Sequence, residues 1–153
     1  MLISRNRKAL FDYEIIEKFL AGIILKGYEA KALRERKVNM EGAYIKPLPD
    51  GLYVVGMHIG RYSSQSQSYQ EENSRAPRKI LLTGREESTI RRALEEKGKT
   101  AVPLAILLKH NLLKIEIALV KGRQKKEKKV VAKERQIKMD LARESKQYKN
   151  SKS

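Results

Sequence analysis

Residues 104–119 read LAILLKHNLLKIEIAL, with apolar side chains alternating with their neighbours on both sides of His110-Asn111. A period of two puts every second side chain on the same face of a β-strand. Each half therefore predicts a strand with one buried face, and the polar pair between the halves predicts a turn. The stretch predicts a β-hairpin whose buried positions are Leu104, Ile106, Leu108, Leu113, Ile115, Ile117 and Leu119.

Two earlier stretches also predict strands. Residues 43–45 and 52–59 are mostly apolar, and residues 47–51 between them read PLPDG. The Asp-Gly step supplies the positive φ angle that a hairpin turn needs, so we expect another hairpin here. Residues 13–25 predict one long strand that is bent or bulged at Ala21-Gly22.

Two segments have the composition of helices. Residues 29–36 are good helix formers, but this length gives only about two turns. Residues 84–97 should form a longer helix, because Thr83 and Glu86 have the spacing of a capping box and Gly98 stands where a helix ends.

These elements together predict a mostly β fold. We expect about five or six strands and about two or three short helices, arranged as a small β-barrel of the oligonucleotide-binding type. A split β-α-β fold fits the same pattern and stays open at this point. The domain should span residues 1–120, with a polar and mobile loop at 63–77, and a basic tail should follow over residues 121–153.

Positive charge is distributed over both parts of the chain. The formal net charge is +16, from 34 Lys and Arg against 18 Asp and Glu. Residues 121–153 hold 13 of the basic and 4 of the acidic side chains, which leaves 21 basic and 14 acidic ones in residues 1–120. Both parts carry a surplus of cations, so a polyanion such as RNA is the expected partner.

Several classes of function have no support in the composition. The chain has no cysteine, and His58 and His110 lie far apart, so we expect no metal, no cofactor and no thiol chemistry. Adjacent carboxylates such as Glu86-Glu87 fit a solvated surface, and no nucleotide-binding glycine loop or G-x-S-x-G motif occurs, so we expect no enzyme. The apolar run 102–108 is far shorter than the roughly 20 residues of a membrane helix. Residues 1–8 lack the apolar core of a signal peptide, so we expect a cytoplasmic monomer with no membrane partner.

Cations and aromatic side chains together favour RNA binding. Basic residues are spread through the domain, and tyrosines can stack on bases. His58 fits either a core position or a position that faces RNA. The other candidate RNA-binding residues that composition offers are Arg7, Lys8, Tyr13, Lys31, Arg34, Arg78 and Lys79.

The chain carries a series of short motifs in a fixed order. They are Asn6-Arg7-Lys8-Ala9, Asp12-Tyr13, Ala21-Gly22-Ile23, Gly27-x-Glu29-x-Lys31-x-Leu33-Arg34, Gly56-x-His58-Ile59, Arg78-Lys79-Ile80-Leu81-Leu82, Gly98-x-Thr100-x-x-Pro103-Leu104 and Lys121-Gly122. Over residues 5–135 this series strongly resembles the small protein B family, the SsrA-binding proteins.

The resemblance implies an adaptor in the rescue of stalled ribosomes. Its barrel would bind the tRNA-like domain of transfer-messenger RNA and deliver this RNA to the ribosome for trans-translation. Its tail, disordered when free, would become helical in the vacant messenger channel, against ribosomal RNA of the decoding region. The tail residues implied in ribosome binding are Lys121, Gly122, Lys125, Lys126, Lys128, Lys129, Lys133 and Arg135.

The resemblance also implies roles for individual residues of the domain. Asn6 and Leu81 match positions at or near the RNA surface of the family, although the residues alone favour a cap for Asn6 and a core position for Leu81. Leu20 stands where the family usually has Glu, and Thr83 and Leu107 also depart from its pattern. These departures concern individual contacts rather than the role.

Two other functions fit the surplus charge. A structural ribosome-binding protein could thread its basic tail through ribosomal RNA, and a general RNA chaperone would bind unrelated RNAs with similar affinity.

Overall fold

The computed structural model describes residues 1–63 and 71–122. The chain divides into two units, Met1–Gly122 and Arg123–Ser153. The second unit lies outside the described residues, and so does the expected helical state of the tail. Of the loop expected at 63–77, residues 64–70 lie outside the description, and the rest includes a short 3-10 helix, η1 (Glu71–Asn73).

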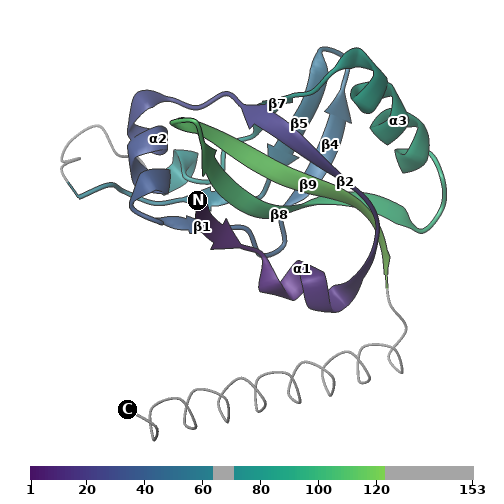
Figure 1. The fold of residues 1–153 in the computed structure, drawn as a ribbon, viewed down its shortest axis with the longest axis horizontal. Helices are drawn as coiled ribbons and strands as arrows, with labels where there is room; N and C mark the ends of the chain where they lie inside the picture. The colour runs from purple at the N-terminus through teal and green to yellow at the C-terminus, as the bar shows by residue number, and fades with distance from the viewer. Residues whose placement is uncertain (64–70, 123–153) are drawn as a thin grey trace, which may run out of the picture. The chain divides into compact units, whose positions relative to one another are not determined.

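The first unit is built on one antiparallel sheet with seven strands in the described residues (Figure 1). A small pair of strands, β3 (Val38–Asn39) and β6 (His58–Ile59), stands apart from it. In order across the main sheet, the strands are β1 (Leu2–Arg5), β8 (Lys99–Lys109), β9 (Leu112–Gly122), β2 (Tyr13–Ile23), β7 (Arg78–Leu81), β5 (Gly51–Val55) and β4 (Tyr44–Leu48).

The sheet is open rather than closed into a barrel. Among the described residues, the edge strands β1 and β4 share no ladder of hydrogen bonds. Two features oppose closure, because β1 has only 4 residues and Pro47 in β4 has no N–H to donate. The predicted class, mostly β with short helices, is confirmed, and in place of the predicted small barrel the structure has a seven-stranded sheet that is not closed.

The hairpin predicted over residues 104–119 is confirmed and is longer than expected. His110 and Asn111 have φ angles of 50° and 63°. Positive φ at both residues of a two-residue turn matches the right-handed twist of the flanking strands. The turn therefore directs β9 back along the whole length of β8.

One face assignment in this hairpin is wrong. The register of β8 against β9 shifts between Pro103 and Ala105, so Leu104 is an extra residue in β8. The shift reverses the alternation, and Leu104 packs with Val102 in a different cluster from Ile106.

The long strand predicted at residues 13–25 is also confirmed as β2, but its irregularity does not lie at Ala21-Gly22, where it was expected. The register of β2 shifts between Ile15 and Glu17. Gly22, where the bend was expected, pairs regularly with Lys114 of β9 and Leu81 of β7. The glycine is therefore part of a central ladder.

The hairpin of β4 and β5 is confirmed, but β5 ends earlier than expected. Gly56 has a φ of 80°, which turns the chain out of the sheet. His58 and Ile59 then form β6.

Three α-helices occur in the described residues. Two were expected: α2 (Gly27–Arg34) and α3 (Gly84–Leu94), the latter with the Thr83 and Glu86 capping box in place. The third, α1 (Arg7–Asp12), has only 6 residues and was not predicted.

Two apolar clusters lie on opposite faces of the central strands. The larger cluster includes Ile115 and Ile117 of β9 and Leu33 of α2. The smaller one lies under α1, where Ala9 packs against Ala118 and Val120. Helix α1 therefore covers one part of the outer sheet face.

A buried ion pair joins α2 to β7. The side chain of Arg78 is 3% exposed and that of Glu29 is 9% exposed, and Arg78 Nε lies 2.6 Å from Glu29 Oε2. The other guanidinium nitrogens donate to Met57 O at 2.7 Å and Ser74 O at 2.9 Å. Glu29 Oε1 accepts the N–H of Lys26 at 3.0 Å. The Arg78 guanidinium is thus used within the protein, and the expectation of an RNA contact by Arg78 is corrected to a structural role.

A second side-chain bond stabilises the turn between β4 and β5. The Tyr53 hydroxyl donates to Asp50 Oδ2 at 2.6 Å. This hydrogen bond lowers the pKa of the Asp50 carboxyl and raises the pKa of the Tyr53 hydroxyl. Both groups therefore keep their usual charge states at neutral pH.

We expect Arg78→Met to lower the free energy of unfolding by about 3–5 kcal/mol, because Glu29 would remain buried without its ion-pair partner. Urea denaturation of the wild type and the variant measures the difference. Arg75→Met is the matched control. Exposed Arg75 donates one hydrogen bond to Gly56 O at 3.0 Å, so its loss should cost less than about 1.5 kcal/mol. Equal losses in the two variants would contradict the role of Arg78.

We expect Tyr53→Phe to raise the pKa of the Asp50 carboxyl toward its ordinary range, because the hydrogen bond from the Tyr53 hydroxyl is the largest cause of its lowering. Because the folded-state pKa is lowered, the stabilisation is present above the unfolded pKa and disappears as the pH falls through the folded one. Titration of the Asp50 carboxyl by NMR in both proteins checks this. An identical titration curve in the variant would show that the hydroxyl is not the cause.

Candidate nucleic-acid interface

The sheet face that carries α1 continues beyond the helix as an exposed strip. On β9, Ala118 lies under α1, and Lys114 and Glu116 follow at alternate positions on the same face. On β2, Leu20 lies opposite Glu116, and Gly22 lies opposite Lys114. Directly opposed residues of antiparallel strands share a face. The outer strip, as we call it, consists of Lys18, Leu20, Gly22, Ile24, Lys79, Leu81, Lys114 and Glu116.

The outer strip exposes three large apolar side chains. Leu20 is 40% exposed, Ile24 is 52% exposed and Leu81 is 53% exposed. A Cβ at position 22 would lie 3.4 Å from the Cβ of Leu81, so glycine lets Leu81 lie close against β2. Leu81 is therefore a surface residue, which corrects the core position that the residues alone favoured. Adjacent exposed apolar side chains of this kind mark interaction surfaces.

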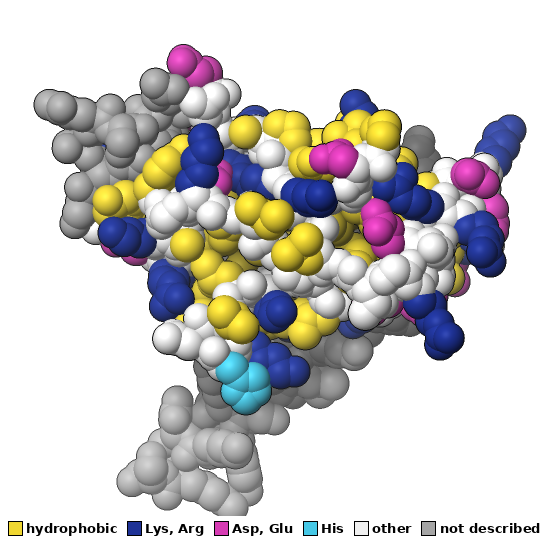
Figure 2. Space-filling view, turned by 90° about the horizontal axis from the view of Figure 1, so that it is seen from above, with side chains coloured by type: hydrophobic (Ala, Val, Ile, Leu, Met, Phe, Trp, Pro, Cys, Tyr) yellow, Lys and Arg dark blue, Asp and Glu magenta, His cyan; other side chains and the backbone are white. Residues whose placement is uncertain are grey.

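Lysines border these apolar side chains. Lys18 and Lys114 lie on the strands beside Leu20 and Gly22, and Lys79 lies on β7, opposite Tyr53 of β5. Figure 2 shows one face of the molecule, on which Lys and Arg side chains lie between hydrophobic ones. This mixture suits RNA, because lysines neutralise phosphates and flat or apolar side chains cover bases and sugars.

Asn6 is a buried residue that attaches α1 to the sheet. Its Oδ1 accepts the N–H of Ala9 at 3.2 Å, and its Nδ2 donates to Met40 O at 3.2 Å and Pro103 O at 2.9 Å. The cap that the residues alone favoured is confirmed. The amide is used internally, so Asn6 positions α1 instead of offering a polar group to RNA.

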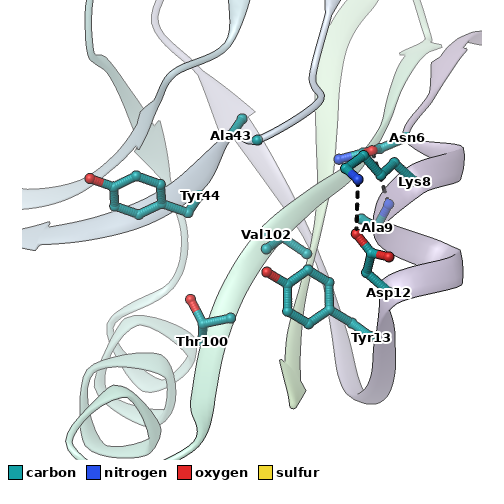
Figure 3. Close-up of a pocket in the computed structure, with 10 residues that line it drawn as sticks. Asn6, Lys8, Ala9, Asp12, Tyr13, Ala43, Tyr44, Thr100 and Val102 are labelled. Carbon is teal, nitrogen blue, oxygen red and sulfur yellow. Dashed lines mark hydrogen bonds and ion pairs between the residues drawn. The ribbon is translucent and has the colours of Figure 1, made fainter. Parts of the chain in front are cut away.

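Beside α1 lies a pocket of about 250 Å³ (Figure 3). Tyr13 packs against the apolar cluster under the helix and lines this pocket with Tyr44. Lys8 is exposed, and its Nζ lies 3.4 Å from Asp12 Oδ2. Arg7 is also exposed, at the first position of α1. This end of the outer face therefore carries cations and an aromatic ring.

The candidates on α2 and β6 lie away from the strands of the outer strip. Lys31 is exposed, with its Nζ 5.3 Å from the centre of the Tyr62 ring. Arg34 donates to Oδ1 and O of Asn111 at 3.5 and 3.3 Å, which ties α2 to the hairpin turn. His58 is half-buried, with Nε2 3.4 Å from Oε1 of Glu71 in η1. None of these three side chains belongs to the outer strip, and each has a different partner.

Only part of the expected RNA-binding set therefore lies in one place. The structure brings Lys79 and Leu81 together with Leu20. Tyr13 packs under α1 on the same sheet face, and α1 carries Arg7 and Lys8. Sequence reasoning missed Lys18, Gly22 and Lys114 as members of the strip. The alternation in β9 contained a signal for Lys114, because this lysine stands between the apolar residues Leu113 and Ile115, which face the other side of the strand.

The tail residues begin inside the sheet. Lys121 and Gly122 pair with Glu14 and Tyr13 of β2, so β9 runs two residues past the expected boundary at 120. Lys121 Nζ also lies 3.5 Å from Glu14 Oε2. The remaining expected tail residues, Lys125, Lys126, Lys128, Lys129, Lys133 and Arg135, lie outside the described residues.

None of the helices in residues 1–63 and 71–122 combines the length and apolar composition that a membrane-spanning helix requires. In the same residues, no cluster of three or more His, Cys, Asp or Glu side chains could hold a metal ion.

Comparisons with known proteins agree on one family. The family model described as SmpB protein matches residues 3–147. The SsrA-binding protein of Mycoplasma mobile is 40% identical over 127 residues, which are 83% of this chain and 86% of the relative. The SsrA-binding protein of Persephonella marina is 37% identical over 148 residues, which are 97% and 94% of the two chains.

A solved structure gives the same result for the fold. The structure described as "tmRNA-SmpB: a journey to the center of the bacterial ribosome" contains a chain that is 34% identical and superposes with a TM-score of 0.67. The match covers 84% of this chain and 93% of the other. By sequence and by fold, this chain belongs to the SmpB protein family.

Proposed function

We propose that this protein is an RNA-binding adaptor for transfer-messenger RNA. It binds the tRNA-like domain of this RNA and delivers it to stalled ribosomes in the cytoplasm for trans-translation. It acts by binding, without catalysis of its own. The relatives named SsrA-binding protein and the solved tmRNA-SmpB structure support the proposal.

The observation that carries the proposal is the outer strip. Leu20, Ile24 and Leu81 are exposed side by side on adjacent strands, and Lys18, Lys79 and Lys114 border them. A surface that served only to keep the protein in solution would carry charged or polar side chains in place of these three apolar ones. A structured RNA can cover them with sugars and unpaired bases while its phosphates reach the lysines.

The basic tail supplies the second half of the proposed function. Residues 121–153 hold 13 basic and 4 acidic side chains. A surplus of this size favours a path lined by ribosomal RNA, and binding there would report that the messenger channel is empty. Specificity for transfer-messenger RNA would then belong to residues 1–122.

A competition binding assay at near-physiological salt tests this division. It compares the tRNA-like domain of transfer-messenger RNA with an ordinary tRNA of equal length, for the full chain and for residues 1–122. We expect both proteins to prefer the tRNA-like domain, because the outer strip is complete without the tail. Equal affinity for both RNAs would indicate a general RNA chaperone, and a preference lost on truncation would place specificity in the tail.

We expect Leu81→Ser to weaken binding of the tRNA-like domain by roughly 10- to 100-fold, because burial of a leucine side chain against RNA would be lost. The fold should be unaffected, since Leu81 is 53% exposed. Filter-binding titration measures the affinity, and thermal unfolding checks the fold. Leu112→Ser is the matched control, since Leu112 is 60% exposed at the start of β9, where it pairs with Lys109 of β8 and with no residue of β2. An equal loss of affinity in both variants would argue against a site at Leu81.

A further inference from the structure

A second cavity, of about 400 Å³, opens at one end of the outer strip. It lies where β2 gives way to α2, beside the segment that leads into β7. Ile24 and Lys79 belong both to the outer strip and to the wall of this cavity. A molecule bound on the strip therefore has direct access to it. The Tyr28–Tyr53 pocket, as we call it, is lined in particular by Ile24, Lys26, Tyr28, Tyr53, Pro77 and Lys79.

Part of the wall of the Tyr28–Tyr53 pocket is aromatic and aliphatic. Tyr28 and Tyr53 are both half-buried, so each ring keeps an accessible surface. The Tyr53 hydroxyl is held by Asp50 at 2.6 Å, which fixes the ring in place. Ile24 and Pro77 add apolar surface without hydrogen-bonding groups on their side chains. The pocket therefore fits a flat group that needs few specific polar partners.

The inner part of the pocket is rigid. Glu29 and Arg78 line it, and they form the buried ion pair with 2.6 Å between Oε2 and Nε. The guanidinium also donates to Met57 O and Ser74 O, and the carboxylate also accepts from Lys26 N–H. Because these groups bond to one another and to the backbone, the cavity is preformed.

Two lysines set the charge at the pocket. Lys26 is exposed, and its Nζ lies 5.8 Å from the centre of the Tyr28 ring. Lys79 is half-buried opposite Tyr53. A flat group bound in the pocket would therefore lie near both tyrosine rings and near two lysine ammonium groups, which could pair with the phosphates of an RNA whose base occupies the pocket.

We infer that the Tyr28–Tyr53 pocket binds a single unpaired nucleobase of the RNA held on the outer strip. Unpaired bases are recognised in this way, by stacking on aromatic side chains next to basic ones. The cavity is within the roughly 300–1,000 Å³ typical of sites for small ligands. This inference rests on the proposed function, and it adds a position in the RNA where the base of one unpaired nucleotide is bound.

The test uses the tRNA-like domain of transfer-messenger RNA with an abasic nucleotide placed at each unpaired position in turn. One abasic position should weaken binding to the wild-type protein by roughly 5- to 150-fold, the usual range for loss of one stacked base. Tyr28→Leu should weaken binding of the intact RNA by a similar factor, since the apolar volume remains while the flat ring is lost. The Tyr28→Leu variant should bind the abasic RNA as tightly as it binds the intact RNA, because the substitution in the protein and the missing base remove the same contact.

Tyr62→Leu is the matched control. Tyr62 is also half-buried and also lies under a lysine, with Lys31 Nζ 5.3 Å from its ring, but it lies outside the pocket. In this variant the abasic substitution should still cost the full factor. The inference would be overturned if the loss from the abasic nucleotide multiplied with the loss from the protein substitution in both variants and at every position. It would also be overturned if no abasic position weakened binding to the wild-type protein.

A readout in the wild-type protein covers the case in which Tyr28→Leu does not fold. The fluorescence of 2-aminopurine at the sensitive position should change when the protein binds, and unchanged fluorescence at every unpaired position would also overturn the inference. Failure of the proposed function gives a different result, because the intact tRNA-like domain would then bind the wild-type protein no better than tRNA does.

Discussion

The ion pair of Arg78 and Glu29 holds together three parts of the protein that are distant in sequence. It joins α2 to β7 across 49 positions, and the remaining donors of Arg78 attach the chain at Met57 and Ser74. Buried charges are tolerated only when their hydrogen-bonding capacity is filled, as it is here. The start of α2, the chain at Met57 and the first residue of β7 thereby acquire fixed positions. The Tyr28–Tyr53 pocket, which both members of the pair line, depends on that junction, as do Lys79 and Leu81 of the outer strip, which follow Arg78 on β7.

Arginine in this domain is used largely as a structural tie. Arg36 donates to Leu2 O and Ile3 O, and Arg91 donates to Leu48 O at 2.6 Å. The planar guanidinium suits such multiple bonds to carbonyl oxygens, whereas the lysine ammonium stays hydrated. This difference explains why the number of cations predicted the kind of partner, a polyanion, but not which part of the surface would bind it. Arg78 is in the core, while Lys18 and Lys114 lie on the outer strip.

The sequence was informative where one physical rule decides the outcome. Alternation predicted the hairpin of β8 and β9, and a capping box predicted α3, since both are local properties. The register shifts in β2 and β8 depend on contacts between strands, so the face of Leu104 was assigned wrongly. The exposure of Leu20 and Leu81 was likewise hidden, because an apolar residue gives no indication of whether α1 covers its part of the sheet.

The end of β9 has a mechanical consequence for the tail. Gly122 pairs with Tyr13, and its neighbour Lys121 pairs with Glu14 on one side and Lys99 on the other. A pull on Gly122 along the strand would load two ladders of hydrogen bonds in parallel instead of opening them one at a time. Tension applied at Gly122 would thus reach the central strands of the sheet without unravelling β9 from its end.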